Sequence, residues 1–176
     1  MRPNTPTPQD AITIRPAQPA DAGEYLQLVD ALARYERMPL LDASAKVRLV
    51  DHLFGQRPYY KLLVAEDTTT GHLVGYAAWF LSYSTFMARP TFYLEDLFVL
   101  AEYRRTQVGS RLVQTCAKTA LAEGCGRMDF LVLDWNEMAL QFYKKHGLKE
   151  HREWLLHRAD SEVIRALAHP DEHPLT

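Results

Sequence analysis

The sequence is short of cysteine, of net charge and of long apolar runs, and each shortage excludes a class of protein. Its 176 residues include 2 cysteines, and 22 acidic residues against 20 basic ones leave a formal net charge of −2. Such a balance gives no general attraction to nucleic acid or to an anionic membrane surface. No apolar run reaches the roughly 20 residues that a transmembrane helix needs. We therefore expect neither nucleic acid nor a membrane as a partner.

Metal binding and secretion are not indicated either. Cys116 and Cys125 have no neighbouring histidine or cysteine at metal-ligand spacing, which predicts a reducing compartment and no metal site. Residues 1–10 are rich in proline and lack the apolar segment of a signal peptide. We expect a disordered lead-in over residues 1–10, a single domain over 11–168, a flexible tail over 169–176, and a cytoplasmic location.

Apolar periodicity predicts both strands and helices in this domain. One predicted strand begins at Ile12, and others cover 61–66, 72–82, 93–100 and 128–133. A loop is predicted at 83–90, and the chain is predicted to return to the sheet at 148–158. The first predicted helix has its N-cap at Asp21, carries Tyr25 in its apolar stripe and ends near Tyr35. A second ends before Gly55, a third runs from Val108 to Gly124, a fourth runs from an N-cap at Asn136 to Gly147, and the last covers 161–168. This pattern indicates an α/β fold.

Two acids, Glu95 and Asp96, lie in the otherwise apolar strand predicted at 93–100. Regular alternation would send their side chains to opposite faces, so both can reach one cleft only if the strand contains a bulge. Unpaired acids are costly in such a strand, and an ion pair with arginine is the alternative to a functional role.

The turn at 102–110 leads into the helix predicted from Val108, and it carries Arg104 and Arg105. A helix start offers unpaired backbone N–H groups and the positive end of the helix dipole, which together suit a pyrophosphate. The alternative is a solvated basic turn.

Asn136 and Tyr143 lie seven positions apart, hence on one helix face and about 10 Å apart along its axis. This spacing suits two contacts along an extended ligand. A half-buried core aromatic is the alternative for Tyr143.

Taken together, these segments resemble a known family. The matching motifs are Ile14-Arg15-Pro16-Ala17, Ala33-Arg34-Tyr35-Glu36, Tyr93-Leu94-Glu95-Asp96, Tyr103-Arg104, Val132-Leu133-Asp134-Trp135-Asn136 and Phe142-Tyr143-Lys144-Lys145-His146-Gly147. They resemble the GCN5-related N-acetyltransferase (GNAT) superfamily, and more closely its spermidine/spermine and thialysine N-acetyltransferases. The resemblance implies a mixed, mainly antiparallel sheet that splays in its middle and is flanked by helices.

The resemblance also implies the ligand and the site. Acetyl-CoA would be the co-substrate, held by Leu97, Phe98, Val99, Arg104, Arg105, Thr106, Gln107, Val108, Gly109, Ser110, Asn136 and Tyr143. Glu95 would accept the substrate's proton through water, and Asp96 would hold a cationic substrate. Tyr143 would protonate the departing thiolate, while the Val99 N–H would stabilise the thioester oxyanion.

The turn departs from the family pattern at two positions, because Arg105 and Gln107 stand where glycine is usual. Replacing glycine costs on the order of 1 kcal/mol if the backbone must be left-handed. If position 107 is already helical, little is lost.

The expected reaction is direct acetyl transfer to a primary amine of a small cation, either a diamine or polyamine or a lysine-like amino acid such as thialysine. Tyr83-Ser84-Thr85-Phe86 resembles the thialysine-type sequence, whereas the polyamine-type relatives carry an extra acid there. A protein-lysine or N-terminal acetyltransferase and a non-catalytic acetyl-CoA-binding module are the other interpretations. A homodimer is expected from the resemblance.

Overall fold

The computed structural model describes residues 11–170, and contacts divide the chain after Leu131 into two compact units. The first unit contains the sheet and three long helices, and the second contains α4 (Glu137–Lys145) and α5 (Ser161–Ala168). The lead-in predicted at 1–10 and most of the tail predicted at 169–176 lie outside the described residues.

The first unit is built on one five-stranded sheet in the order β1-β2-β3-β4-β5. Its strands are β1 (Ile12–Pro16), β2 (Lys61–Asp67), β3 (His72–Ser84), β4 (Arg89–Val99) and β5 (Arg127–Asp129). Neighbours pair antiparallel from β1 to β4, whereas β5 pairs parallel to β4. The parallel pairing ends at Tyr93 and Asp129, while β4 continues to Val99. The predicted mixed, mainly antiparallel sheet is therefore confirmed.

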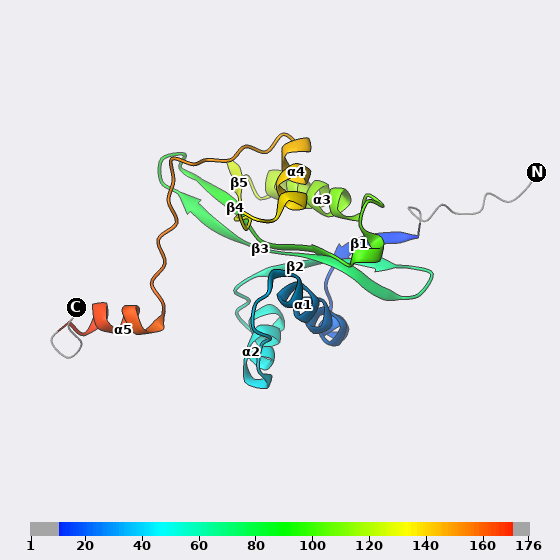
Figure 1. Ribbon diagram of the computed structural model, residues 1–176, viewed down its shortest axis with the longest axis horizontal. Helices are drawn as coiled ribbons and strands as arrows, with labels where there is room; N and C mark the ends of the chain where they lie inside the picture. The colour runs from blue at the N-terminus through cyan, green and yellow to red at the C-terminus, as the bar shows by residue number, and fades with distance from the viewer. Residues whose placement is uncertain (1–10, 171–176) are drawn as a thin grey trace, which may run out of the picture. The chain divides into compact units, whose positions relative to one another are not determined.

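Helices cover both faces of this sheet (Figure 1), with α1 (Ala22–Glu36) and α2 (Ala43–Phe54) on one face and α3 (Val108–Ala122) on the other. Each face has its own apolar cluster. The α3 face buries Leu63, Ala77, Trp79, Phe92, Leu94, Val108, Leu112 and Cys116, and the α1 face buries Tyr25, Leu28, Leu53, Val64, Tyr76, Ala78 and Phe98. Short 3-10 turns at Pro19–Asp21 and Ala101–Tyr103 precede α1 and the turn that leads to α3.

A β-bulge at Glu95 interrupts β4. The register passes from Ala78 opposite Asp96 to Trp79 opposite Leu94, so Glu95 is the extra residue of β4. Leu94 and Leu97 can therefore both face the α3 cluster although they are three positions apart. The bulge predicted from the sequence is present.

The start of α1 is held to the sheet by Arg15 of β1. Its guanidinium donates to Glu66 of β2 at 2.6 Å and to the two carboxylate oxygens of Asp21 at 2.7 and 2.9 Å. Asp21 also accepts the Gln18 N–H at 2.7 Å. Asp21 thus stands at the expected N-cap position, but its carboxylate binds Arg15 rather than the helix.

Three local predictions were wrong in extent or in kind. The loop expected at 83–90 is shorter, because β3 runs to Ser84 and β4 starts at Arg89. The strand expected at 128–133 is confined to Arg127–Asp129, and residues 148–158 form no strand. A strand exists only where its backbone groups meet a neighbouring strand. None of the strands in residues 11–170 pairs with 148–158, and periodicity cannot reveal a missing partner.

Candidate active site

The bulge in β4 gives its two acids different environments. Glu95 is exposed, whereas Asp96 is partly buried and accepts a hydrogen bond of 3.2 Å from the Tyr76 hydroxyl. Within residues 11–170, neither carboxylate forms an ion pair. The alternative of a structural pair with arginine is therefore not found among these residues, and neither acid is neutralised by an ion pair there.

Burial, the largest cause, and the negative charge of Glu95 raise the pKa of Asp96 from 3.8 to about 6. The Tyr76 hydrogen bond acts in the opposite direction, and the Glu36 charge adds a smaller increase. Glu36 is the last residue of α1, and burial raises its pKa as well. The charges of Glu95 and Glu36 thus both act on Asp96, and none of the three acids forms an ion pair within residues 11–170, which is an environment that favours binding of an ammonium group.

A chain of phenols extends from Asp96 on the α1 face. The Tyr76 ring meets the Tyr25 ring edge-on at 5.2 Å, and the Tyr25 and Tyr60 hydroxyls are 3.3 Å apart. Tyr60 gives its proton to the Leu49 carbonyl at 2.9 Å, so Tyr25 is the donor to Tyr60. Sequence reasoning placed Tyr25 only in an apolar stripe and missed this network. The available signal was that a buried phenol requires a hydrogen-bond partner.

The turn before α3 contains two left-handed residues, Arg105 with φ 65° and Gln107 with φ 70°. Gln107 stands at the N-cap of α3 and makes no side-chain capping bond. Of the two conformations considered for position 107, left-handed and helical, the structure has the left-handed one, which is costly for a residue other than glycine. The Tyr103 hydroxyl holds the turn to β2 by donating to Asp67 at 2.9 Å, and Thr106 donates to the Tyr103 carbonyl.

The Arg104 side chain is directed to the α1 face of the sheet. Its Nε donates to the Val99 carbonyl at 3.0 Å, and its guanidinium carbon lies 4.6 Å from the centre of the Tyr35 ring. Tyr35 belongs to the α1-face cluster, whereas Val108 at the start of α3 belongs to the cluster on the other face. Arg104 was predicted to hold the pyrophosphate, but its guanidinium already contacts Val99 and Tyr35.

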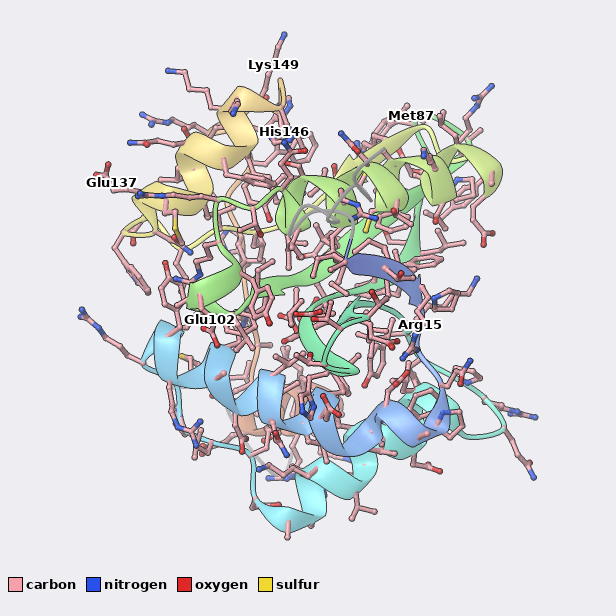
Figure 2. All side chains as sticks on the ribbon, turned by 90° about the vertical axis from the view of Figure 1, so that its right-hand side faces the viewer. Arg15, Met87, Glu102, Glu137, His146 and Lys149 are labelled. Carbon is pink, nitrogen blue, oxygen red and sulfur yellow. The ribbon has the colours of Figure 1, made fainter. Side chains whose placement is uncertain are left out.

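The second unit provides Asn136 and Tyr143. Asn136 caps α4, since its side-chain oxygen accepts the Ala139 N–H at 3.2 Å, as the sequence predicted. Tyr143 is partly buried, with its ring 5.3 Å from that of Phe142. Figure 2 shows α4 running from Glu137 at one end to His146 at the other.

A separate hollow of about 220 Å³ is lined by Tyr59, Tyr60, Lys61, Trp79 and Phe80, among others. The Lys61 ammonium lies 4.8 Å from the centre of the Trp79 ring and pairs with Glu123 at 3.0 Å. A cation already occupies this aromatic surface, so the hollow does not suit a cationic substrate.

Comparison with known proteins identifies the family. The acetyltransferase (GNAT) family model matches residues 25–148. The chain belongs to this family. It is 36% identical over 166 residues to a thialysine N-epsilon-acetyltransferase from Bos taurus, covering 89% of this chain and 97% of the relative. An L-ornithine N5-acetyltransferase from Arabidopsis thaliana is 26% identical over 197 residues, covering 88% of this chain and 86% of the relative.

Solved structures show the same fold. An integron cassette protein from Vibrio cholerae superposes with a TM-score of 0.76 at 21% sequence identity, covering 90% of this chain and 98% of the other. The resemblance found in the sequence is thus confirmed, and this GNAT protein is an acetyl-CoA-dependent N-acetyltransferase.

No cluster of residues within 11–170 could hold a metal ion, and none of the helices there is long and apolar enough to span a membrane.

Gln107→Gly should stabilise this GNAT protein. Glycine adopts a left-handed backbone without steric cost, so we expect the free energy of unfolding to rise by about 1 kcal/mol. Gln114→Gly is the matched control on an exposed position inside α3, where glycine should lower it by about 0.5–1 kcal/mol. Urea denaturation of the three proteins measures both effects. A Gln107→Gly variant no more stable than the wild type would contradict strain at this position.

Asp96→Asn should alter how stability depends on pH. Because the pKa of Asp96 is raised from 3.8 to about 6, the folded state binds more protons than the unfolded state between these values. The contribution of Asp96 to stability therefore falls as pH rises through this window. We expect the stability of the wild type relative to Asp96→Asn to decrease from pH 4 to pH 7 in urea titrations. A constant difference would show that Asp96 titrates normally.

Proposed function

We propose that the acceptor is the side-chain amine of a small basic amino acid of the thialysine, lysine or ornithine type, or the terminal amine of a short diamine. The observation that carries this proposal is the bulge of β4, which leaves Glu95 exposed next to Asp96 while neither Glu36, Glu95 nor Asp96 forms an ion pair among residues 11–170. The relatives named for thialysine and ornithine agree with it, because both substrates present one amine on a short aliphatic chain.

The β3–β4 hairpin supports a short acceptor over a polyamine. Residues 83–86, where polyamine-type relatives are expected to carry an extra acid, contain none here. Tyr83 is 64% and Phe86 is 97% exposed at this hairpin. A second ammonium would find no carboxylate on this segment, so spermine gains little over a short diamine.

Glu95 is proposed as the base that acts through a water molecule. An amine with a pKa near 10 is almost fully protonated at neutral pH, and attack on the thioester requires loss of that proton. Glu95 is exposed at the bulge and has no ion-pair partner in the described part of the chain, so water can reach it. The neighbouring Asp96 is proposed to hold the ammonium form before the proton leaves.

Acetyl-CoA is proposed to bind along the end of β4 and the following turn. Leu97, Phe98 and Val99 would contact its acetyl and pantetheine portion, with the Val99 N–H donating to the oxyanion. The backbone of Arg104, Arg105, Thr106, Gln107, Val108, Gly109 and Ser110 would surround the pyrophosphate at the start of α3.

Asn136 and Tyr143 of α4 are proposed to complete the reaction. Asn136 would contact the pantetheine arm, and Tyr143 would donate its phenolic proton to sulfur. The amine nitrogen bonds to the acetyl carbon, the carbon–sulfur bond breaks, and the CoA thiolate takes this proton. A cytoplasmic homodimer remains our expectation for the assembled protein.

A panel of amines tests the proposed acceptor. We expect thiol release from acetyl-CoA with thialysine, lysine, ornithine or a short diamine, at a higher kcat/KM than with spermine. Spermine equal to or better than the best short amine would overturn the choice of acceptor. Activity confined to lysine-containing or N-terminal peptides would identify a protein acetyltransferase instead.

Tyr143→Phe tests the acid. Loss of the proton donor should lower kcat by about 10²-fold to 10⁴-fold. The affinity for acetyl-CoA, measured by calorimetry, should change little because the ring is retained. Tyr59→Phe is the matched control, since Tyr59 is 73% exposed and lines the separate hollow. A kcat within threefold of the wild type for Tyr143→Phe would remove Tyr143 from the mechanism.

A further inference from the structure

The side chain of Arg104 connects the acetyl-CoA turn to α1. Its Nε donates to the Val99 carbonyl at 3.0 Å, and its guanidinium carbon lies 4.6 Å from the centre of the Tyr35 ring and 5.8 Å from that of the Phe98 ring. Figure 2 shows the 3-10 turn carrying Glu102 next to the C-terminal end of α1. Arg104 follows that 3-10 turn directly.

Tyr35 occupies the last turn of α1, and Glu36 is the next residue. The helix ends there because Arg37 adopts a left-handed conformation with φ 59°. Tyr35 packs against the α1-face cluster that contains Tyr76, and the Tyr76 hydroxyl donates to Asp96 at 3.2 Å. The negative charge of Glu36 also raises the pKa of Asp96. A group that fixes Tyr35 therefore also fixes one of the three carboxyls proposed to receive the amine.

The two ends of α1 are held in similar ways. Arg15 binds Asp21 at the start of the helix, and Glu24 in the first turn accepts the Leu73 N–H at 2.7 Å. At the other end, Tyr35 receives the Arg104 guanidinium, which comes from the turn before α3. The first attachment joins α1 to strands alone, whereas the second joins it to a segment proposed to bind the cofactor.

We propose that Arg104 is a positioning residue that couples the two ligand sites: its guanidinium, packed on Tyr35 and bonded to Val99, makes ordering of the turn by acetyl-CoA also order the end of α1 that carries Glu36, on the sheet face where Tyr76 binds Asp96. This inference rests on the proposed function of the turn and of the three carboxyls. It assigns the Arg104 side chain to the acceptor side of the sheet, while the backbone of the turn serves the pyrophosphate.

The test is a double-mutant cycle on Arg104 and Tyr35. Arg104→Met keeps the aliphatic stem and removes the charge, and Tyr35→Leu removes the ring. Each should raise both the KM for the amine and the calorimetric Kd for acetyl-CoA about threefold to thirtyfold, the range of one cation–π contact, with kcat nearly unchanged. The double variant should be no worse than the poorer single variant, because both remove one interaction.

Controls separate positioning from simple loss of structure. Arg34→Gln, which alters an exposed arginine on the same helix turn, should resemble the wild type. Reduced kcat at unchanged KM and Kd would indicate a smaller folded fraction and would overturn the inference. If Tyr35→Leu does not fold, Arg104→Lys, which cannot reproduce the stacked planar group, should show the same paired rise.

Two further outcomes separate failure of the coupling from failure of the proposed function. The coupling would be overturned if the fold-changes of the two single variants multiplied in the double variant. It would also be overturned if only the KM for the amine or only the Kd for acetyl-CoA changed. If the wild type releases no thiol with any amine, the proposed function fails instead. The calorimetric Kd series still tests the contact between Arg104 and Tyr35 in that case.

Discussion

The pairing of β3 with β4 around the bulge at Glu95 is the constraint on which the rest of this structure depends. One extra residue lets Leu94 and Leu97 both face the α3 cluster while Asp96 and Phe98 face α1. Without the bulge, one of these apolar positions would exchange faces with an acid, and burial of that acid would be costly. The same irregularity leaves Glu95 exposed. The geometry that preserves both cores is thus also the geometry that presents the proposed base.

The electrostatics of the α1 face depend on two acids that no ion pair neutralises among the described residues. Arg15 neutralises Asp21 and Glu66, but in residues 11–170 no arginine or lysine neutralises Glu95 or Asp96. The Tyr76 hydroxyl stabilises the Asp96 carboxylate by donating a hydrogen bond to it, without contributing a positive charge. The carboxyls therefore keep their affinity for a cation, as the proposed amine acceptor requires.

The turn before α3 shows how local strain is offset by neighbouring contacts. Arg105 and Gln107 both adopt left-handed conformations that favour glycine. The hydrogen bond from Tyr103 to Asp67 and the position of Arg104 against Tyr35 hold the turn at both faces of the sheet. Strain of this kind persists only where the surroundings over-determine the backbone, and it is common at ligand sites. The side chains of Tyr103 and Arg104 thus serve the fold, which leaves the backbone of the turn for the proposed ligand.

The sequence by itself determined the α/β class, the long helices, the bulge and the family, because periodicity and motif spacing are local properties that survive in a single chain. It also placed Asn136 at the N-cap of α4. Tertiary structure alone decided the left-handed conformation of Gln107, the short β5, and the absence of a strand at 148–158. It alone brought Tyr25, Tyr60 and Glu36 into the surroundings of Asp96 and sent Arg104 to Tyr35. These features depend on pairing and packing between residues far apart in the chain, which no local pattern encodes.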